Sequence, residues 1–214
     1  MNRAIFVLTI CIVSCAAWAG DLVAVDKPEW RVGDTWSFER TDYPHFEYAN
    51  TTRSRYTLVV TGVEPTFYRV DYSENSDGTT SAPAHWRFSP AINFMGFIRE
   101  KSTWQEFLWF KWPLKIGATW DASWFTPNAG DSVSRISVKG WEDVEVPAGR
   151  FRGLRVDIEW KGFAIHEVAH NTRSVWYVPG VKRLVRFEEW VYASGYMIRH
   201  RIDELASYSI HSGK

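Results

Sequence analysis

The chain of 214 residues carries 25 basic and 25 acidic residues, so its formal net charge is zero. This balance, with no run of Lys and Arg, argues against nucleic acid or an anionic membrane surface as a partner. The unusual feature is the aromatic content, because 16% of the residues are Phe, Trp or Tyr and 13 residues are Trp.

The first predicted element is a leader. One cation, Arg3, precedes an uncharged run at 4–19 that ends in the small-residue pattern Ala17-Trp18-Ala19. This pattern predicts a signal peptide at 1–19, too short for a membrane span, whose removal leaves one β domain at 20–214. The sequence at 12–15 also fits the pattern before a lipid-modified cysteine, so the alternative is a lipoprotein signal at 1–14 with an acyl anchor on Cys15.

Either leader predicts export. We expect the protein in the periplasm or secreted, or as an outer-membrane lipoprotein if Cys15 is acylated, with membrane contact only through that anchor. Both cysteines, Cys11 and Cys15, lie in the leader. The mature domain therefore has no disulfide and has to be stabilised by its own core.

Four segments after the leader alternate apolar and polar residues with period two, at 56–60, 68–72, 154–160 and 196–202. This period is typical of strands with one apolar face, and such one-sided strands favour antiparallel pairing. Turn residues separate the segments, and their spacing predicts about nine to eleven strands. We expect an all-β fold with little helix, in which a single curved antiparallel sheet forms an open or half barrel.

One phrase occurs twice along the chain. The sequence Trp-Arg-Val-Gly-Asp-Thr-Trp at 30–36 is echoed by Lys-Ile-Gly-Ala-Thr-Trp at 115–120. In each copy a glycine turn is expected to lead into a strand whose first inward residue is a large indole. We interpret the two copies as equivalent strand starts.

Several motifs occur in order: W-x-x-G-x-x-W at 30–36, P-L-K-x-G-x-x-W at 113–120, V-P-A-G-x-F at 146–151 and W-Y-x-P-x-V-K at 176–182. In this combination the chain resembles TapB-like and related bacterial exported domains of unknown function, over about residues 28–190. The resemblance implies a curved antiparallel sheet similar to the half-barrels of periplasmic lipoprotein carriers. It implies no reaction and no catalytic residues.

Aromatic side chains are concentrated between residues 104 and 125. Indole faces stack on sugars and acyl chains, and a curved sheet offers a concave surface on which to present them. One interpretation is a binding site for an amphiphile, a glycan or a partner protein; the other is that the rings fill a wide barrel. The residues predicted to bind the ligand are Trp104, Trp109, Trp112, Trp120 and Trp124.

The sharpest chemical motif is H-E-x-x-H at 166–170. On a helix, His166 and His170 would share one face and bind zinc, Glu167 would act as the base, and Glu189 would complete the ligand set. The flanking sequence leaves room for only a short helix, and Glu189 lies in an alternation typical of a strand. On a strand the two histidines would lie about 13 Å apart, too far to share one metal without bending.

Glu189 also shares the face of the apolar residues around it, so we expect its carboxylate to be buried and paired. The preferred hypothesis is a non-enzymatic binding domain of the bacterial envelope, with no catalytic residue, cofactor or metal. The alternatives are a zinc metallopeptidase using the H-E-x-x-H motif and a structural or assembly lipoprotein.

Overall fold

The structure, a computed structural model, describes residues 24–44, 50–98, 103–126, 130–164 and 167–211. The predicted leader with Cys11 and Cys15 lies outside the described residues, and so does His166. Where it is described, the chain is almost entirely strand, and within these ranges no helix is long and apolar enough to cross a membrane.

Thirteen strands form one antiparallel sheet. Their bounds are β1 (Thr35–Pro44), β2 (Thr52–Val63), β3 (Tyr68–Ser76), β4 (Thr79–Thr80), β5 (Ala84–Phe88), β6 (Phe94–Ile98), β7 (Thr103–Glu106), β8 (Thr119–Thr126), β9 (Gly130–Val146), β10 (Gly149–Ala164), β11 (Glu167–Val178), β12 (Arg183–Ala193) and β13 (Tyr196–Ser209). A 3-10 turn, η2 (Pro179–Val181), joins β11 to β12.

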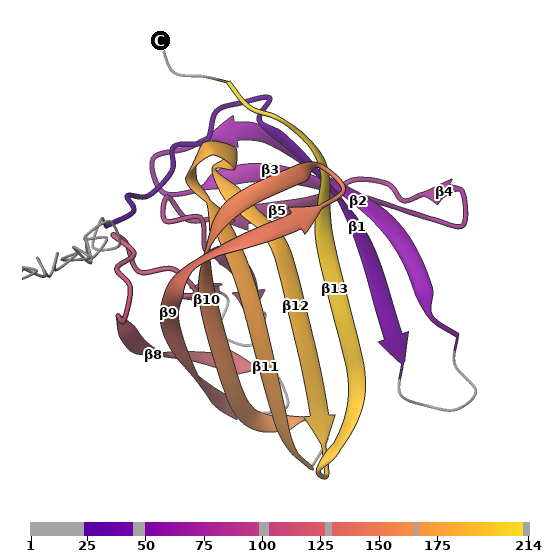
Figure 1. The fold of residues 1–214 in the computed structure, drawn as a ribbon, viewed down its shortest axis with the longest axis vertical. Coiled ribbons are helices and arrows are strands. Elements are labelled where there is room, and N and C mark those ends of the chain that lie inside the picture. The colour runs from indigo at the N-terminus through magenta and orange to yellow at the C-terminus, as the bar shows by residue number, and fades with distance from the viewer. Residues whose placement is uncertain (1–23, 45–49, 99–102, 127–129, 165–166, 212–214) are drawn as a thin grey trace, which may run out of the picture.

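The strand order is β7-β6-β5-β3-β2-β1-β13-β12-β11-β10-β9-β8, with β4 beside β3. The first long strand therefore pairs with the last, and the sheet curls until it is nearly closed (Figure 1). The expected fold class is confirmed, but the expected nine to eleven strands were too few. The difference comes from β4 to β7, which have two to five residues each and are too short to show a period.

The edge strands β7 and β8 are bridged by the segment that joins them. The ring of Phe107 lies 5.4 Å from that of Trp124 on β8, and Trp120 donates from Nε1 to the carbonyl of Leu108 at 3.2 Å. Phe110 is buried, and its ring lies 6.1 Å from that of Tyr177 on β11. The segment 107–118 thus reaches the inner face of the sheet.

The inner face of the sheet holds the core. Alternate residues of the long strands point inward, and their apolar members are fully buried because the curled sheet encloses them. The largest of these are Trp36, Phe38, Leu58, Tyr177, Leu154, Ile158, Ile136 and Leu205.

The two copies of the repeated phrase start their strands in the same way, as expected. Gly33 and Gly117 both have positive φ, at 90° and 81°. Gly33 N donates to Val60 O at 2.8 Å, and Gly117 N donates to Val138 O at 2.9 Å. The same turn therefore precedes β1 and β8, and in each case it is hydrogen-bonded to the neighbouring strand, β2 or β9.

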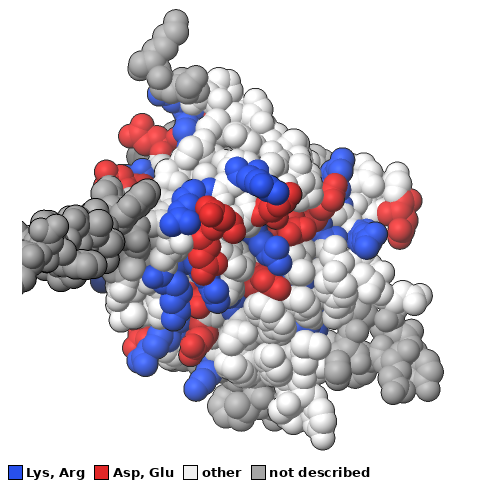
Figure 2. Space-filling view, viewed as in Figure 1, with Lys and Arg blue, Asp and Glu red and all other residues white. Residues whose placement is uncertain are grey.

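The outer face is charged but balanced. On β10 and β12, Arg155 pairs with Asp157, and Arg186 pairs with Glu204 of the next strand. Figure 2 shows blue and red residues interspersed over this side of the molecule. A surface of this kind is solvated and offers no patch of one sign.

Candidate functional site

The five tryptophans predicted to bind a ligand do not share one surface. Trp104 on β7 is 37% exposed, whereas Trp124 on β8 is buried. Trp120 is half-buried on the same strand, and Trp109 and Trp112 belong to the segment that bridges the edges. The structure therefore divides the aromatic cluster between packing and an open surface.

Trp109 contributes to packing. Its ring is stacked on that of Phe187, with centroids 6.2 Å apart, and the guanidinium carbon of Arg173 lies 5.3 Å from the ring. Both neighbours lie on the inner face, so Trp109 fills the barrel interior. Its Nε1 is buried without a hydrogen-bond partner.

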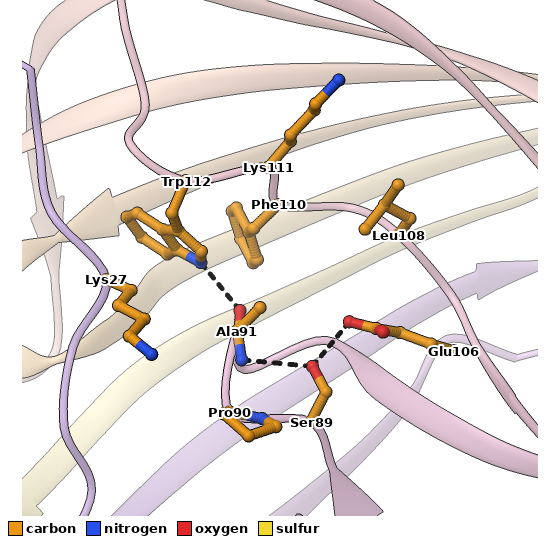
Figure 3. A pocket seen from close by; sticks show the side chains of 9 residues that line it. All are labelled: Lys27, Ser89, Pro90, Ala91, Glu106, Leu108, Phe110, Lys111 and Trp112. Atoms are coloured by element: carbon orange, nitrogen blue, oxygen red, sulfur yellow. Dashed lines mark hydrogen bonds between the residues drawn. The ribbon is translucent and has the colours of Figure 1, made fainter. Parts of the chain in front are cut away.

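Trp112 lies at an open hollow of about 440 Å³. The lining residues are Lys27, Ser89, Pro90, Ala91, Glu106, Leu108, Phe110, Lys111 and Trp112. Figure 3 shows Phe110 and Trp112 side by side, facing the turn that carries Ala91. The two rings are stacked with centroids 5.6 Å apart, and Trp112 donates from Nε1 to the Ala91 carbonyl at 2.8 Å.

Asn93 holds this hollow in shape. It is 1% exposed and donates from Nδ2 to the Phe110 carbonyl at 2.9 Å and to Glu106 Oε1 at 2.8 Å. Its Oδ1 accepts from Phe110 N at 2.7 Å. Glu106 also accepts from Ser89 Oγ at 2.6 Å (Figure 3). The apolar wall is thereby fixed to the opposite turn.

The charge in the hollow is uneven. Glu106 accepts the hydrogen bonds from Asn93 and Ser89 at one oxygen, Oε1, and contributes one negative charge. Lys27 and Lys111 are exposed, and neither forms an ion pair with another described residue. The hollow therefore combines stacked rings with two available cations.

Charged side chains also occupy the inner face, toward the end where β1 finishes and β2 begins. Arg40 on β1 and Asp203 on β13 lie opposite each other, with Nε and Oδ1 3.1 Å apart. Arg201 also pairs with Asp203, Tyr56 donates to it at 2.9 Å, and Arg40 reaches Glu74 at 3.0 Å. This network was not predicted.

Glu189 is buried and paired, as expected. It accepts from Asn171 Nδ2 at 2.8 Å and from Arg173 Nε at 2.7 Å, and Arg199 lies 3.4 Å away. Burial alone would raise the pKa of Glu189, but the charges of Arg173 and Arg199 and the hydrogen bond from Asn171 hold it below its ordinary value.

The described part of the H-E-x-x-H motif, Glu167 to His170, lies on β11 and is extended. The peptidase interpretation needs a helix there, and the structure has a strand that pairs His170 with Tyr192 of β12. Among the described residues no three His, Cys, Asp or Glu side chains are placed to hold a metal ion. Because His166 lies outside these residues, the zinc site stays a prediction.

No protein-family model and no curated protein matches the sequence. Among solved structures, a Parabacteroides distasonis protein described as a lipoprotein matches with TM-score 0.51 and 16% identity, over 87% of this chain and 100% of that one. An exported protein with a YmcC-like fold from Bacteroides fragilis has TM-score 0.47 and 16% identity over the same shares. The hypothetical lipoprotein YmcC from Escherichia coli has TM-score 0.39 and 11% identity, over 80% of this chain and 84% of that one.

The Parabacteroides protein shares the fold of this chain. At 16% identity the likeness assigns no residue a role. The curved antiparallel sheet implied by the resemblance to bacterial exported domains is confirmed, whereas the narrower TapB-like assignment stays a prediction.

Proposed function

We propose that the chain is an exported, non-enzymatic binding domain that holds an anionic amphiphile in the hollow beside Trp112. The observation that carries the proposal is the meeting, in one open hollow, of stacked rings and two lysines that form no ion pair with a described residue. Its volume of about 440 Å³ lies within the range of ligand pockets, roughly 300 to 1,000 Å³. The segment 107–118 supplies four of the lining residues: Leu108, Phe110, Lys111 and Trp112.

Each part of the hollow matches one part of such a ligand. Leu108 and the rings of Phe110 and Trp112 offer an apolar surface for a hydrocarbon chain. Lys27 and Lys111 offer positive charge to an acidic head group, and their two charges exceed the single negative charge of Glu106, the one carboxylate among the described residues that line the hollow. A glycan or a partner protein would not need an apolar surface beside a positively charged one.

Export is supported by the predicted leader. The fold similarity to a protein described as a lipoprotein points the same way. Which cleavage site is used decides whether the protein carries an acyl anchor on Cys15, and mass spectrometry of the mature N-terminus distinguishes the two cases. Acylation of Cys15 would place the hollow next to a membrane.

The test is calorimetric titration of the purified protein with dodecanoate and with dodecanol, which has the same chain without the charge. We expect dodecanoate to bind more tightly, and Trp112→Ala to weaken its binding by about tenfold or more. Trp104→Ala is the matched control, because Trp104 belongs to the same aromatic cluster but does not line the hollow. Lys27→Gln with Lys111→Gln should remove the preference for dodecanoate over dodecanol.

Two results would overturn the proposal. One is equal affinity for the charged and uncharged amphiphile. The other is an equal loss in the Trp104 and Trp112 variants, which would mean that the hollow is not the site. Binding of oligosaccharides but not amphiphiles would instead favour the glycan alternative.

A further inference from the structure

Arg183 is a buried cation with no counter-charge among the described residues. It is the first residue of β12 and is only 8% exposed. Within the described ranges its guanidinium makes no ion pair, and its Nε is buried without a hydrogen-bond partner. Arg173 and Arg201, on the same inner face, each bind a carboxylate. Arg183 therefore differs from its neighbours in having no counter-charge.

Four aromatic rings surround this guanidinium. Its central carbon lies 5.2 Å from the ring of Trp30, 5.6 Å from Trp36, 5.9 Å from Phe38 and 5.1 Å from Phe88. Ring faces attract the positive charge, but a guanidinium has five directional N–H donors that rings do not satisfy. The rings leave donors available, and we call these four residues the aromatic cage.

Two residues of the aromatic cage are held by the backbone at the end of the turn before β12. Trp30 donates from Nε1 to the Lys182 carbonyl at 2.8 Å, and Trp36 donates from Nε1 to the Val181 carbonyl at 2.9 Å. These bonds fix the start of β12, and with it Arg183, relative to the rings. A site fixed in this way loses little conformational entropy on binding.

Arg183 keeps its charge at neutral pH. Burial lowers the pKa of the Arg183 guanidinium to about 10, and the Tyr56 hydroxyl partly opposes this shift. Buried charges in proteins are normally paired, because an uncompensated charge in a dry environment is costly. A bound anion would supply the missing charge and accept from the open donors.

We propose that Arg183 and the aromatic cage form a binding site for a small oxyanion, either a carboxylate or a phosphate group. The planar fork of a guanidinium matches two oxygens of such a group. Since nine-tenths of the side chain is buried, a group of a few atoms fits better than a chain. The site shares no residue with the hollow beside Trp112 and does not depend on the function proposed there.

The test is thermal unfolding of the purified protein in phosphate, acetate or octanoate, each against chloride at equal ionic strength. We expect at least one oxyanion to raise the unfolding midpoint. Arg183→Met should weaken its binding roughly ten- to a hundredfold, because charge-assisted hydrogen bonds are lost. Arg183→Lys keeps the charge without the planar fork, so its affinity for the oxyanion should lie between those of the wild type and Arg183→Met.

The matched control is Arg135→Met, which removes an exposed guanidinium paired with Asp121 and should respond as the wild type does. Trp112→Ala should respond to phosphate and to acetate as the wild type does, which separates this site from the hollow. Stabilisation by phosphate would indicate a free anion. Stronger stabilisation by octanoate than by acetate that persists in Trp112→Ala and is lost in Arg183→Met would indicate the head group of a larger ligand at Arg183.

The proposal is overturned if no oxyanion stabilises the wild-type protein more than chloride does, a comparison that needs no variant. It is also overturned if Arg183→Met gains as much stability from oxyanions as the wild type and the control Arg135→Met do. Arg183 would then be a packing residue held by the rings alone.

Discussion

Arg40 and Asp203 face each other inside the barrel, where the first long strand pairs with the last. Their neighbours on the same face, Phe38 and Leu205, are fully buried and apolar. Asp203 also receives Arg201 from its own strand and the Tyr56 hydroxyl from β2. One carboxylate thus joins three adjacent strands, β2, β1 and β13, in the middle of the strand order.

Removing this carboxylate should be costly. Asp203 is 2% exposed, so Asp203→Ala leaves Arg40 and Arg201 without their shared partner in a largely buried place. We expect the free energy of unfolding in urea to fall by about 3–5 kcal/mol. Asp143→Ala, which removes an exposed carboxylate paired with Arg152, should change it by less than about 0.5 kcal/mol. Similar losses in both variants would contradict the proposed role of Asp203.

The same network predicts loss of stability in acid. Burial alone would raise the pKa of Asp203, but Arg201 and Arg40 lower it below its ordinary value, and the pKa of Glu189 is lowered in the same way. Groups with lowered pKa contribute stability above their unfolded pKa, about 4, and lose that contribution as pH falls through the folded pKa.

We therefore expect the free energy of unfolding to be steady from about pH 7 to pH 5 and to drop below about pH 4. The variant with both Asp203→Asn and Glu189→Gln should be less stable at neutral pH and should show a shallower drop. If the free energy of unfolding drops as steeply below pH 4 in this variant as in the wild type, other carboxylates cause the drop.

The two equivalent strand starts allow a comparison of matched glycines. Gly33→Ala and Gly117→Ala both place a Cβ on a left-handed backbone, which costs roughly 1–2 kcal/mol. At Gly33 the Cβ would also lie 2.9 Å from the His211 ring, whereas at Gly117 nothing lies within 4 Å. Urea unfolding should therefore show the larger loss for Gly33→Ala, and a larger loss for Gly117→Ala would be inconsistent with these contacts.

Zinc analysis of the purified protein tests the metallopeptidase alternative. We expect no stoichiometric zinc, because Glu167 to His170 lie on a strand and Glu189 is held by Asn171 and Arg173. Retained zinc that is released by His166→Ala would favour the alternative, and loss of peptidase activity in Glu167→Gln would then identify the base.

Most of the long strands were predictable from the sequence because burial follows their period. At 196–202 the expected faces were wrong, because Tyr196 of the apolar set is 71% exposed and Asp203, in phase with the polar set, is buried. At 154–160 each second residue is apolar and faces inward, and Glu189 was expected to be buried for the same reason. The sequence also indicates the inner charges, because Arg40 and Asp203 lie two residues from Phe38 and Leu205 on the same strands and therefore share their inward face. The pairing of β1 with β13 was not readable, because it joins residues more than 150 positions apart.

The site was predictable only in part. The sequence grouped Trp104 to Trp124 by proximity along the chain, but it does not show that Trp109 turns inward while Trp112 faces an open hollow. That division depends on Asn93, which binds Phe110 from a turn between β5 and β6. Lys27 enters the hollow from a segment far away in the sequence, as only the folded chain can reveal.

The most direct test of amphiphile binding in the hollow is a crystal structure with a bromine-labelled long-chain carboxylate, located by anomalous scattering. We expect a bromine peak beside Phe110 and Trp112, with the carboxylate directed toward Lys27 or Lys111. An empty hollow at saturating ligand, or bromine found only on the outer face of the sheet, would contradict the proposed function.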